Sequence, residues 1–422
     1  MRPLSHVLAL AAALGVCLCA VSASARPGDG ITILSFVFSP NVDVACTWDS
    51  NVYKDKTNAI PDTFLEPELG MRFSSSADTN RFSLVGNVFY SERSYSKEKN
   101  RDFNTFGDSL SLTYGQGKRS SLEIVQSYRH VDDNDRHASD IETSDLAAEM
   151  IEDSNTLDLE RDIHQFGGEV MRRFTDKLEL GLSYRYSGVF YDNVTHDRLD
   201  PKQLFVPYGL DLEGHIFQFD GALQLTDKTD ATITYRHGHQ YQEFTEGSSV
   251  IDTLRIGLQA QGAEKLIYHA GVGYERYQRP GQTSEEATEV LSFNFAADWF
   301  MTEKLTFRCG GYNGTQFSSF YLENGVEYVT FWAGLGYRWK PNITFSVRGI
   351  YRNDDYLDPV MYNSVLVDRD DDRIEGHARI DYIAPGGFLR LFVEGTYDEV
   401  LSNLDFVEYV DERIILGGQL RY

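Results

Sequence analysis

The sequence lacks several features that would assign it to common protein classes. After the first 25 residues, no segment approaches the run of about 18 uncharged apolar residues that a membrane-spanning helix requires. Lys and Arg number 39 against 64 Asp and Glu, so no basic face for phosphate groups is expected, and nucleic acid is excluded as a partner. Only Cys46 and Cys309 follow residue 25, and a single pair of cysteines is not a disulfide framework.

The first 25 residues read as a secretory signal peptide rather than as part of the fold. Arg2 is the charged start, residues 7–21 are apolar, and the small residues Ala23 to Ala25 form a cleavage site. We therefore expect a signal peptide at 1–25. The Cys17 sequence superficially resembles a lipoprotein signal, but the residue before it is the bulky Val16, which disfavours that alternative.

What the chain has in quantity is aromatic residues and glycine. It contains 25 Tyr, 26 Phe and 35 Gly, but only 11 Pro. Aromatic side chains favour strands, and glycine favours the tight turns that join strands. This composition predicts an all-β protein.

Hydrophobic residues alternate with polar ones along much of the sequence. In 177–187, Leu, Leu, Leu, Tyr and Tyr occupy one face and Glu, Gly, Ser, Arg and Ser the other. The segments 343–352 and 413–422 repeat the pattern. Side chains alternate faces along a strand, whereas helical spacing of three and four fits none of these segments. Each is therefore a strand with one apolar and one polar face.

The connections between the expected strands alternate between short and long. Short, turn-like segments lie at 74–79, 115–119, 175–176, 226–229, 261–265, 301–304, 340–342 and 384–387. Longer polar loops lie at 49–62, 91–103, 131–160, 189–208, 242–249, 277–287, 316–325, 354–371 and 399–408. Short turns at one end and long loops at the other are typical of outer-membrane barrels. Together these connections predict about 18 strands, within a range of 16–18.

We therefore predict a transmembrane antiparallel up-and-down β-barrel, exported to the outer membrane of a Gram-negative envelope. A soluble β-sandwich gives no reason to sort loops by length, and no blade repeat of a propeller is found. The expected organisation is the signal peptide at 1–25, a periplasmic lead-in at 26–40 and the barrel at 41–422. The expected partners are outer-membrane lipid, lipopolysaccharide, and the barrel-assembly machinery, which would recognise the C-terminal strand ending in Tyr422.

The stretch 47–73 shows how the first strand gives way to the second. Trp48 belongs at the outer end of the first strand, and Asp49, Ser50 and Asn51 then leave the sheet. A structural transition is favoured over a metal-binding or catalytic cluster. The next strand re-enters at Asp62.

The same stretch resembles the porin-like outer-membrane β-barrel family that is often encoded beside exopolysaccharide-synthesis genes. The similarity lies in Trp48-Asp49-Ser50-Asn51-Val52-Tyr53, in Asp62 and in Pro67-Glu68-Leu69-Gly70. It covers most of the mature chain in pattern, but only this stretch in motif. The resemblance implies an outer-membrane role, with polysaccharide as a candidate partner in export. It supplies no catalytic residues.

The expected inward face is rich in charged residues of both signs. Fixed charges could select solutes in a channel, or they could form ladders that hold the barrel round, and both interpretations stay open. The predicted lumen charge ladder consists of Arg129, Arg172, Arg185, Arg236, Arg255, Arg308, Arg348, Arg379, Arg390, Glu123, Glu179, Asp298, Glu375 and Glu394.

The loop at 131–160 is strongly acidic. It could fold into the lumen and narrow the channel, or it could be a solvated external loop near lipopolysaccharide, and the second interpretation is slightly favoured. The residues of the possible constriction are Asp132, Asp133, Asp135, Asp140, Glu142, Asp145 and Glu149.

No catalytic or metal-binding motif was found, so we predict neither enzyme activity nor a metal or other cofactor. No G-x-S-x-G nucleophile motif occurs. His237 and His239 lie on one strand face, but two ligands without a third are a weak metal signal. A second acidic cluster could hold Ca²⁺, but it lacks the glycine and terminal glutamate of a calcium loop; it consists of Asp368, Asp370, Asp371 and Asp372. Cys46 and Cys309 are expected on lipid-facing positions of strands one and thirteen, too far apart for a disulfide, and thus as free, buried thiols.

Three functions follow, in this order of preference. The first is a porin-like channel for polar or charged solutes, with a link to exopolysaccharide export. The second is a structural or adhesive outer-membrane barrel with a plugged lumen. The third is an outer-membrane hydrolase.

Overall fold

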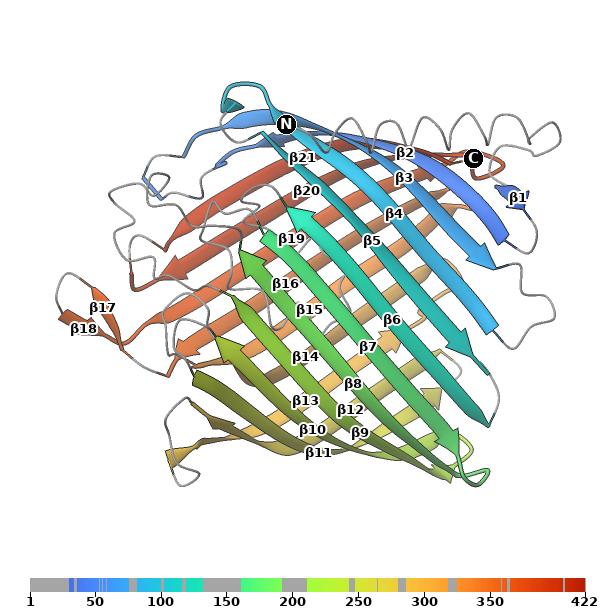
Figure 1. The fold of residues 1–422 in the computed structure, drawn as a ribbon, viewed down its shortest axis with the longest axis vertical. Coiled ribbons are helices and arrows are strands. Elements are labelled where there is room, and N and C mark those ends of the chain that lie inside the picture. Colours follow the sequence, from blue (N-terminus) through green and yellow to red (C-terminus); the bar gives the residue numbers. More distant parts are fainter. Residues whose placement is uncertain are drawn as a thin grey trace.

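A closed β-barrel of eighteen antiparallel strands makes up the computed structural model (Figure 1). Among the described residues, nineteen strands form one sheet; β1 pairs only with β2 there, and the other eighteen close into a ring because β2 pairs with both β3 and β21. The structure describes residues 30–33, 36–52, 54, 56–57, 59–75, 82–99, 102–115, 119–131, 161–191, 211–242, 247–263, 265–279, 286–317, 325–357, 359–362, 365–404 and 407–421.

Each barrel strand is long, as a tilted wall of this kind requires. The strands are β2 (Phe36–Asp49), β3 (Asp62–Ser75), β4 (Phe82–Tyr95), β5 (Phe103–Tyr114), β6 (Ser120–Val131), β7 (Arg161–Arg173), β8 (Leu178–Tyr191), β9 (Leu212–Thr226), β10 (Thr229–Gln242), β11 (Gly247–Ala263), β12 (Leu266–Gln278), β13 (Thr288–Trp299), β14 (Leu305–Phe317), β15 (Gly325–Lys340), β16 (Ile343–Tyr356), β19 (Asp370–Ile383), β20 (Leu389–Ser402) and β21 (Tyr409–Arg421). The predicted all-β barrel and its strand count are confirmed.

The alternation in the sequence divides the wall into two chemically different faces. Leu182 on β8 pairs with Phe219 on β9, which pairs with Tyr235 and then Leu254. Register partners point to the same side of a sheet, so these side chains share one face. Leu182 is 64% exposed and Leu254 is 47% exposed. This face therefore presents apolar side chains to the surroundings.

The second face is the concave, lumen-facing one. Arg255 on β11 reaches past β12 and β13 to donate a hydrogen bond to the carbonyl of Asn313 on β14, at 3.3 Å. A side-chain hydrogen bond that spans two intervening strands is possible only on the inside of a curved wall. The polar residues in register with Arg255, including Thr234 and Asp220, therefore line the lumen.

Connections of unequal length separate the two ends of the barrel. At the turn end, β9 and β10 are joined by residues 227–228 and β15 and β16 by 341–342. At the loop end, β16 and β19 are joined by a long segment that carries the β17–β18 hairpin (Val360–Tyr362 and Val365–Val367), which projects from the barrel (Figure 1). The connection expected at 242–249 is shorter than predicted, because β10 and β11 continue pairing to Gln242 and Gly247.

The N-terminal part of the described chain forms a small hairpin against the first barrel strand. β1 (Ile31–Ile33) pairs with the start of β2, and β2 begins at Phe36. Five residues of the expected lead-in at 26–40 thus belong to the barrel strand, while residues 1–25 lie outside the described part. Within the described residues, no helix has the length and apolarity needed to cross a membrane.

The two cysteines of the described chain are unpaired and lie on the outer face. Cys46 belongs to β2 and Cys309 to β14, the first and thirteenth barrel strands. The prediction that they are separate is confirmed. Cys46 is exposed on the protein surface and Cys309 is half-buried, so the expected burial is wrong for Cys46.

Candidate lumen site

A continuous ladder of charged side chains runs along the inner face of β19 and β20. We call it the ion-pair ladder. At the loop end, Arg373 lies 3.2 Å from Asp398 and 2.9 Å from Glu375. The His377 imidazole then bridges Glu375 and Glu394, at 3.6 and 3.8 Å. The carboxylates thus have partners at alternating positions along two adjacent strands.

The ladder continues to the turn end. Arg379 lies 2.8 Å from Glu394 and 3.1 Å from Asp381, and Arg390 lies 2.8 Å from the same Asp381. The Arg379 guanidinium also stacks on the Phe392 ring at 3.9 Å. Because each charge has an opposite neighbour, this wall presents both signs to the lumen without a large net field.

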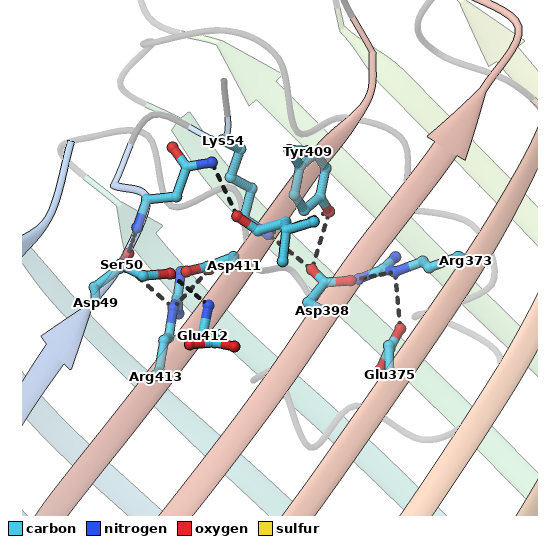
Figure 2. Close-up of polar contacts among 12 residues, drawn as sticks. Asp49, Ser50, Lys54, Arg373, Glu375, Asp398, Tyr409, Asp411, Glu412 and Arg413 are labelled. Carbon is cyan, nitrogen blue, oxygen red and sulfur yellow. Dashed lines mark hydrogen bonds and ion pairs between the residues drawn. The ribbon is translucent and has the colours of Figure 1, made fainter. Parts of the chain in front are cut away.

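The loop after β2 contacts the ion-pair ladder at the loop end of the barrel (Figure 2). Lys54, in this loop, points its ammonium at Asp398 (3.0 Å) and at the Tyr409 hydroxyl (3.3 Å), and its side chain is only 4% exposed. Its backbone has a φ of 49°, a left-handed conformation that a non-glycine residue adopts only when surrounding contacts hold it. The loop is therefore folded against the inner wall.

Burial governs the charge state of Lys54. Desolvation lowers the pKa of Lys54 from 10.5 to about 8, and the Asp398 carboxylate partly opposes this shift. The positive charges of Arg413 and Arg373 lower the pKa further. The ammonium charge is thus retained at neutral pH at an energetic cost.

A second set of contacts joins the same loop to the barrel closure. Asp49 accepts a hydrogen bond from the Asn51 amide, an Asx-type turn, and lies 3.0 Å from Arg413 on β21. Ser50 and Glu412 exchange two hydrogen bonds, as Figure 2 shows. Arg413 also contacts Asp411. Asp49, Ser50 and Asn51 therefore make structural contacts of the kind that the transition between the two strands requires.

A cavity of about 460 Å³ lies on the wall of the lumen formed by β7 to β13. Arg236, Arg255 and His269 line it together with Glu179 and Asp220. Asp220 accepts hydrogen bonds from Thr234 and Gln218, which also line the cavity. The cavity therefore offers cationic and hydrogen-bonding groups to a polar solute.

A repeated dipeptide places several of these arginines, and sequence reasoning missed it. Tyr-Arg recurs at 128–129, 184–185, 235–236, 337–338 and 351–352, and in every case except 337–338 on β15 the strand runs from the turn end to the loop end. Because adjacent residues face opposite sides, each Tyr lies on the outer face and each Arg in the lumen. The spacing of this dipeptide in the sequence was the signal that could have revealed it.

The predicted lumen residues lie on the inner face with one exception. Arg172 is in register with Leu180 and not with Glu179, so it lies on the outer face, where its guanidinium stacks on Phe174 at 5.2 Å. The expectation for Arg172 is corrected; its neighbour Arg173 faces the lumen and bonds Glu179. The alternation in β7 had been assigned one residue out of step. The residues on the inner face are Arg129, Arg185, Arg236, Arg255, Arg308, Arg348, Arg379, Arg390, Glu123, Glu179, Asp298, Glu375 and Glu394.

The predicted constriction loop lies outside the described residues. Its residues, Asp132, Asp133, Asp135, Asp140, Glu142, Asp145 and Glu149, therefore keep the status of a prediction.

The histidine and aspartate clusters singled out in the sequence engage protein partners. His237 contacts Asp252 at 2.8 Å on the outer face, and Asp252 also accepts a hydrogen bond from Tyr235. Asp371 pairs with Arg369, and Asp372 accepts a hydrogen bond from Tyr351. Among the residues that the structure describes, no group of three or more His, Cys, Asp or Glu is arranged to hold a metal ion.

Comparison with known proteins gives structural likeness without sequence relatives. No family model and no curated protein matches the chain. The chain is similar to a BenF-like porin from Pseudomonas fluorescens Pf-5, at 10% identity and a TM-score of 0.48 over 91% of this chain and 99% of that one. It is also similar to Acinetobacter baumannii OccAB4 (10% identity, TM-score 0.47, 94% and 100% covered) and to Pseudomonas aeruginosa OccK2 in complex with glucuronate (13%, 0.47, 92% and 98%).

Proposed function

We propose that this chain is an outer-membrane channel that passes small polar or charged solutes. The observation that carries the proposal is the opposite chemistry of the two faces of one closed wall. The outer face exposes large apolar side chains, among them Leu182, Ile256 and Val347, each more than half exposed. The inner face carries the ion-pair ladder and the arginine-lined cavity.

Apolar side chains around the outside of a closed barrel are favourable in contact with lipid, whereas their exposure to water is unfavourable in free energy. Exposed apolar patches of this extent mark interaction surfaces, and only helices and closed barrels satisfy all backbone groups inside a bilayer. Exposed aromatic residues lie near both ends of the wall, such as Tyr241 at the loop end of β10 and Trp339 at the turn end of β15, as interface residues do. These features support membrane insertion with the strands spanning the bilayer.

The charges on the inner wall bear on which solutes pass. Arg185 on β8 and Arg236 on β10 lie about half the circumference of the eighteen-strand ring from the ion-pair ladder on β19 and β20. A solute in the lumen would therefore meet arginine side chains on one side and paired charges on the other. Such a transverse arrangement suits polar solutes that carry both hydrogen-bonding and charged groups.

The direct test is single-channel conductance of the mature chain, residues 26–422, in a planar bilayer. A matched variant replaces residues 132–160 with a two-residue Asn-Gly connection, since Val131 and Arg161 are register partners at adjacent strand ends. Current in both proteins supports the channel, and a larger current in the variant would show that the acidic loop narrows it. Silence of both proteins at every voltage would contradict the channel function.

A structural barrel with a filled lumen is the second candidate. The observation that favours it is the loop after β2, which places Lys54 against Asp398 at the mouth. If this loop and the ladders fill the lumen, the chain would be silent in the bilayer, and substitution of Lys54 would not restore current.

The cellular setting is part of the same proposal. Export by the signal peptide, recognition of the C-terminal strand by the assembly machinery and contact with lipopolysaccharide remain proposals that follow from a barrel of this kind. The link to exopolysaccharide rests on the resemblance at Trp48 to Gly70. Reduction of the single-channel current by an acidic polysaccharide, but not by dextran of equal size, would support it.

A further inference from the structure

Two neighbouring barrel strands separate at their loop ends. β13 and β14 form register pairs only along 294–299 and 307–312. Beyond these, β13 continues to Thr288 in register with β12, and β14 continues to Phe317 in register with β15. We call the interval between 288–293 and 313–315 the seam. Along the seam, the described residues of β13 and β14 form none of the register pairs that join these two strands over 294–299 and 307–312.

The side chain of Asn313 takes the place of the missing backbone bonds. Its carbonyl oxygen accepts a hydrogen bond from the Phe293 amide at 2.6 Å, and its amide nitrogen donates to the Leu291 carbonyl at 2.7 Å. A carboxamide carries one acceptor and one donor group, as a peptide unit does. One side chain therefore satisfies two backbone groups of β13 that a strand would otherwise pair.

Two further side chains close the seam from the lumen. Glu275 on β12 accepts hydrogen bonds from the Thr315 amide and from the Thr253 hydroxyl, the latter at 2.9 Å, and it is only 3% exposed. Arg255 on β11 donates to the Ser292 hydroxyl at 2.6 Å and to the main-chain carbonyl of Asn313 at 3.3 Å, and its guanidinium lies 3.8 Å from the Glu275 carboxylate. The seam is therefore closed by hydrogen bonds that involve side chains rather than by hydrogen bonds between two backbone groups.

The glycine at 314 makes room for this arrangement. A Cβ at Gly314 would lie 3.3 Å from the Glu275 carboxylate and 3.2 Å from the Tyr328 hydroxyl, which is tighter than ordinary contact. The backbone of β14 can therefore approach Glu275 closely only because the side chain is absent.

The two sides of the seam have opposite character. On the outer face, Leu291 is 74% exposed, and the Phe293 ring stacks with Phe331 at 6.3 Å. On the inner side, Arg255 and Asn294 line the cavity described above. Arg255 thus contacts both the seam and the cavity, so a group that binds its guanidinium from the cavity competes with the contacts that seal the wall.

We propose that the seam is a lateral passage between the membrane and the lumen for an amphiphile with an anionic head group and an apolar chain. The proposal rests on the membrane-spanning part of the proposed function, not on conductance. The head group would replace Ser292 and Asn313 as partners of Arg255 and compete with the Glu275 carboxylate for its guanidinium. The apolar chain would lie along Leu291 and Phe331. The side-chain hydrogen bonds of the seam can break by rotation of the side chains while β13 stays paired with β12 and β14 with β15. In a continuous backbone ladder, by contrast, several backbone hydrogen bonds would have to break together.

The first readout is local opening, measured by hydrogen exchange on the full mature chain in lipid nanodiscs. Asn313→Leu keeps the size of the side chain and removes both bonds. We expect the Phe293 amide to exchange roughly 10- to 30-fold faster, because each bond contributes a modest net stabilisation. Amides along 294–299 should not change. Asn87→Leu, a lumen-facing change within the β4–β5 ladder, is the matched control. Unchanged exchange at Phe293 would overturn the role of Asn313.

The second readout is entry of an amphiphile. The probe is dodecanoate with a photoreactive diazirine on its chain, and the comparison is the same chain with an uncharged sugar head group. We expect the anionic probe to label lumen-facing residues around Arg255 several-fold more in Asn313→Leu than in the parent protein or in Asn87→Leu. Arg255→Gln should lower this labelling.

The outcomes separate this inference from the channel proposal. Lumen labelling in a protein without conductance would support the lateral passage and contradict the channel. Conductance with labelling restricted to the outer face, or equal labelling by both head groups, would contradict the passage and leave the channel intact. If Asn313→Leu fails to fold, Asn313→Asp, which keeps an acceptor and loses the donor, provides the same comparison.

Discussion

The ammonium of Lys54 lies 3.0 Å from the carboxylate of Asp398, and neither side chain is more than 11% exposed. This contact joins a loop at the mouth of the barrel to the first member of the ion-pair ladder. It makes the position of the loop depend on the charge of one lysine, and its pH dependence can be derived.

We predict that seating of the loop after β2 becomes more favourable as pH rises from about 8 to about 10.5. In the seated loop the pKa of Lys54 is lowered to about 8, whereas a released loop would keep the ordinary value of 10.5. Between these values the released form binds more protons, so raising the pH favours the seated form; below pH 8 both forms are protonated and no change is expected.

A spin label at Ile60→Cys, in a protein with Cys46→Ala and Cys309→Ala, would report the seating of this loop. The mobile fraction should fall across the stated window. Lys54→Met is the control, since without the amine the mobile fraction should be independent of pH. A pH dependence that persists in Lys54→Met would assign the effect to another group.

We predict that the two faces of β8 tolerate a cation very differently. Leu182 lies on the outer face, so Leu182→Arg should destabilise the inserted barrel by roughly 2–4 kcal/mol. Ser183, in register with the lumen residue Gln218, should accept the same substitution with little loss. Urea unfolding in lipid vesicles, followed by tryptophan fluorescence, measures both. Equal damage from the two variants would contradict the assignment of faces.

Removal of one member of the ion-pair ladder should lower the free energy of unfolding more than removal of an exposed ion pair does. Arg379→Met leaves Glu394 and Asp381 with fewer cationic partners, so we expect the free energy of unfolding to fall by roughly 1–3 kcal/mol. This is less than for a fully buried pair, because water screens the partly exposed Arg379. Arg119→Met, which loses only an exposed contact with Asp176, is the control and should change little. The same unfolding assay applies, and equal stability of the two variants would argue against a structural role for the ladder.

If the chain conducts, the arginines in the lumen should bias its ion selectivity. Arg185→Glu and Arg236→Glu should shift the reversal potential in a salt gradient toward cation selectivity. Arg172→Glu changes the same charge on the outer face of the wall and should leave the reversal potential near the parent value. Shifts of equal size in all three variants would mean that the selectivity does not arise in the lumen.

The barrel could be predicted from the sequence because its signals are local and repeated. The alternation at 177–187, for example, predicted β8 and both of its faces, and the sorting of short and long connections predicted the closed architecture. Arg172 was assigned to the wrong face because Arg172 and Arg173 both fit a polar position, and only the register with β8 distinguishes them.

The contacts of the candidate site could not be predicted in the same way. The pairs Lys54–Asp398 and Asp49–Arg413 join residues more than 300 positions apart, and they exist because β21 closes the ring beside β2. The replacement of backbone bonds by Asn313 likewise depends on where β13 and β14 separate, for which a single asparagine in the sequence gives no sign. The Tyr-Arg repeat is present in the sequence, but only the register of the strands shows which face of the wall each Tyr and each Arg occupies.

The placement of Cys46 and Cys309 gives the protein two native reporters of its own insertion. Both sulfur atoms lie on the outer face, twelve strands apart in one direction around the ring and six in the other. A water-soluble maleimide would reach Cys46 before the wall enters lipid, and the lipid would then protect it. The time course of alkylation could therefore follow membrane assembly of the unmodified sequence, without the addition of any label.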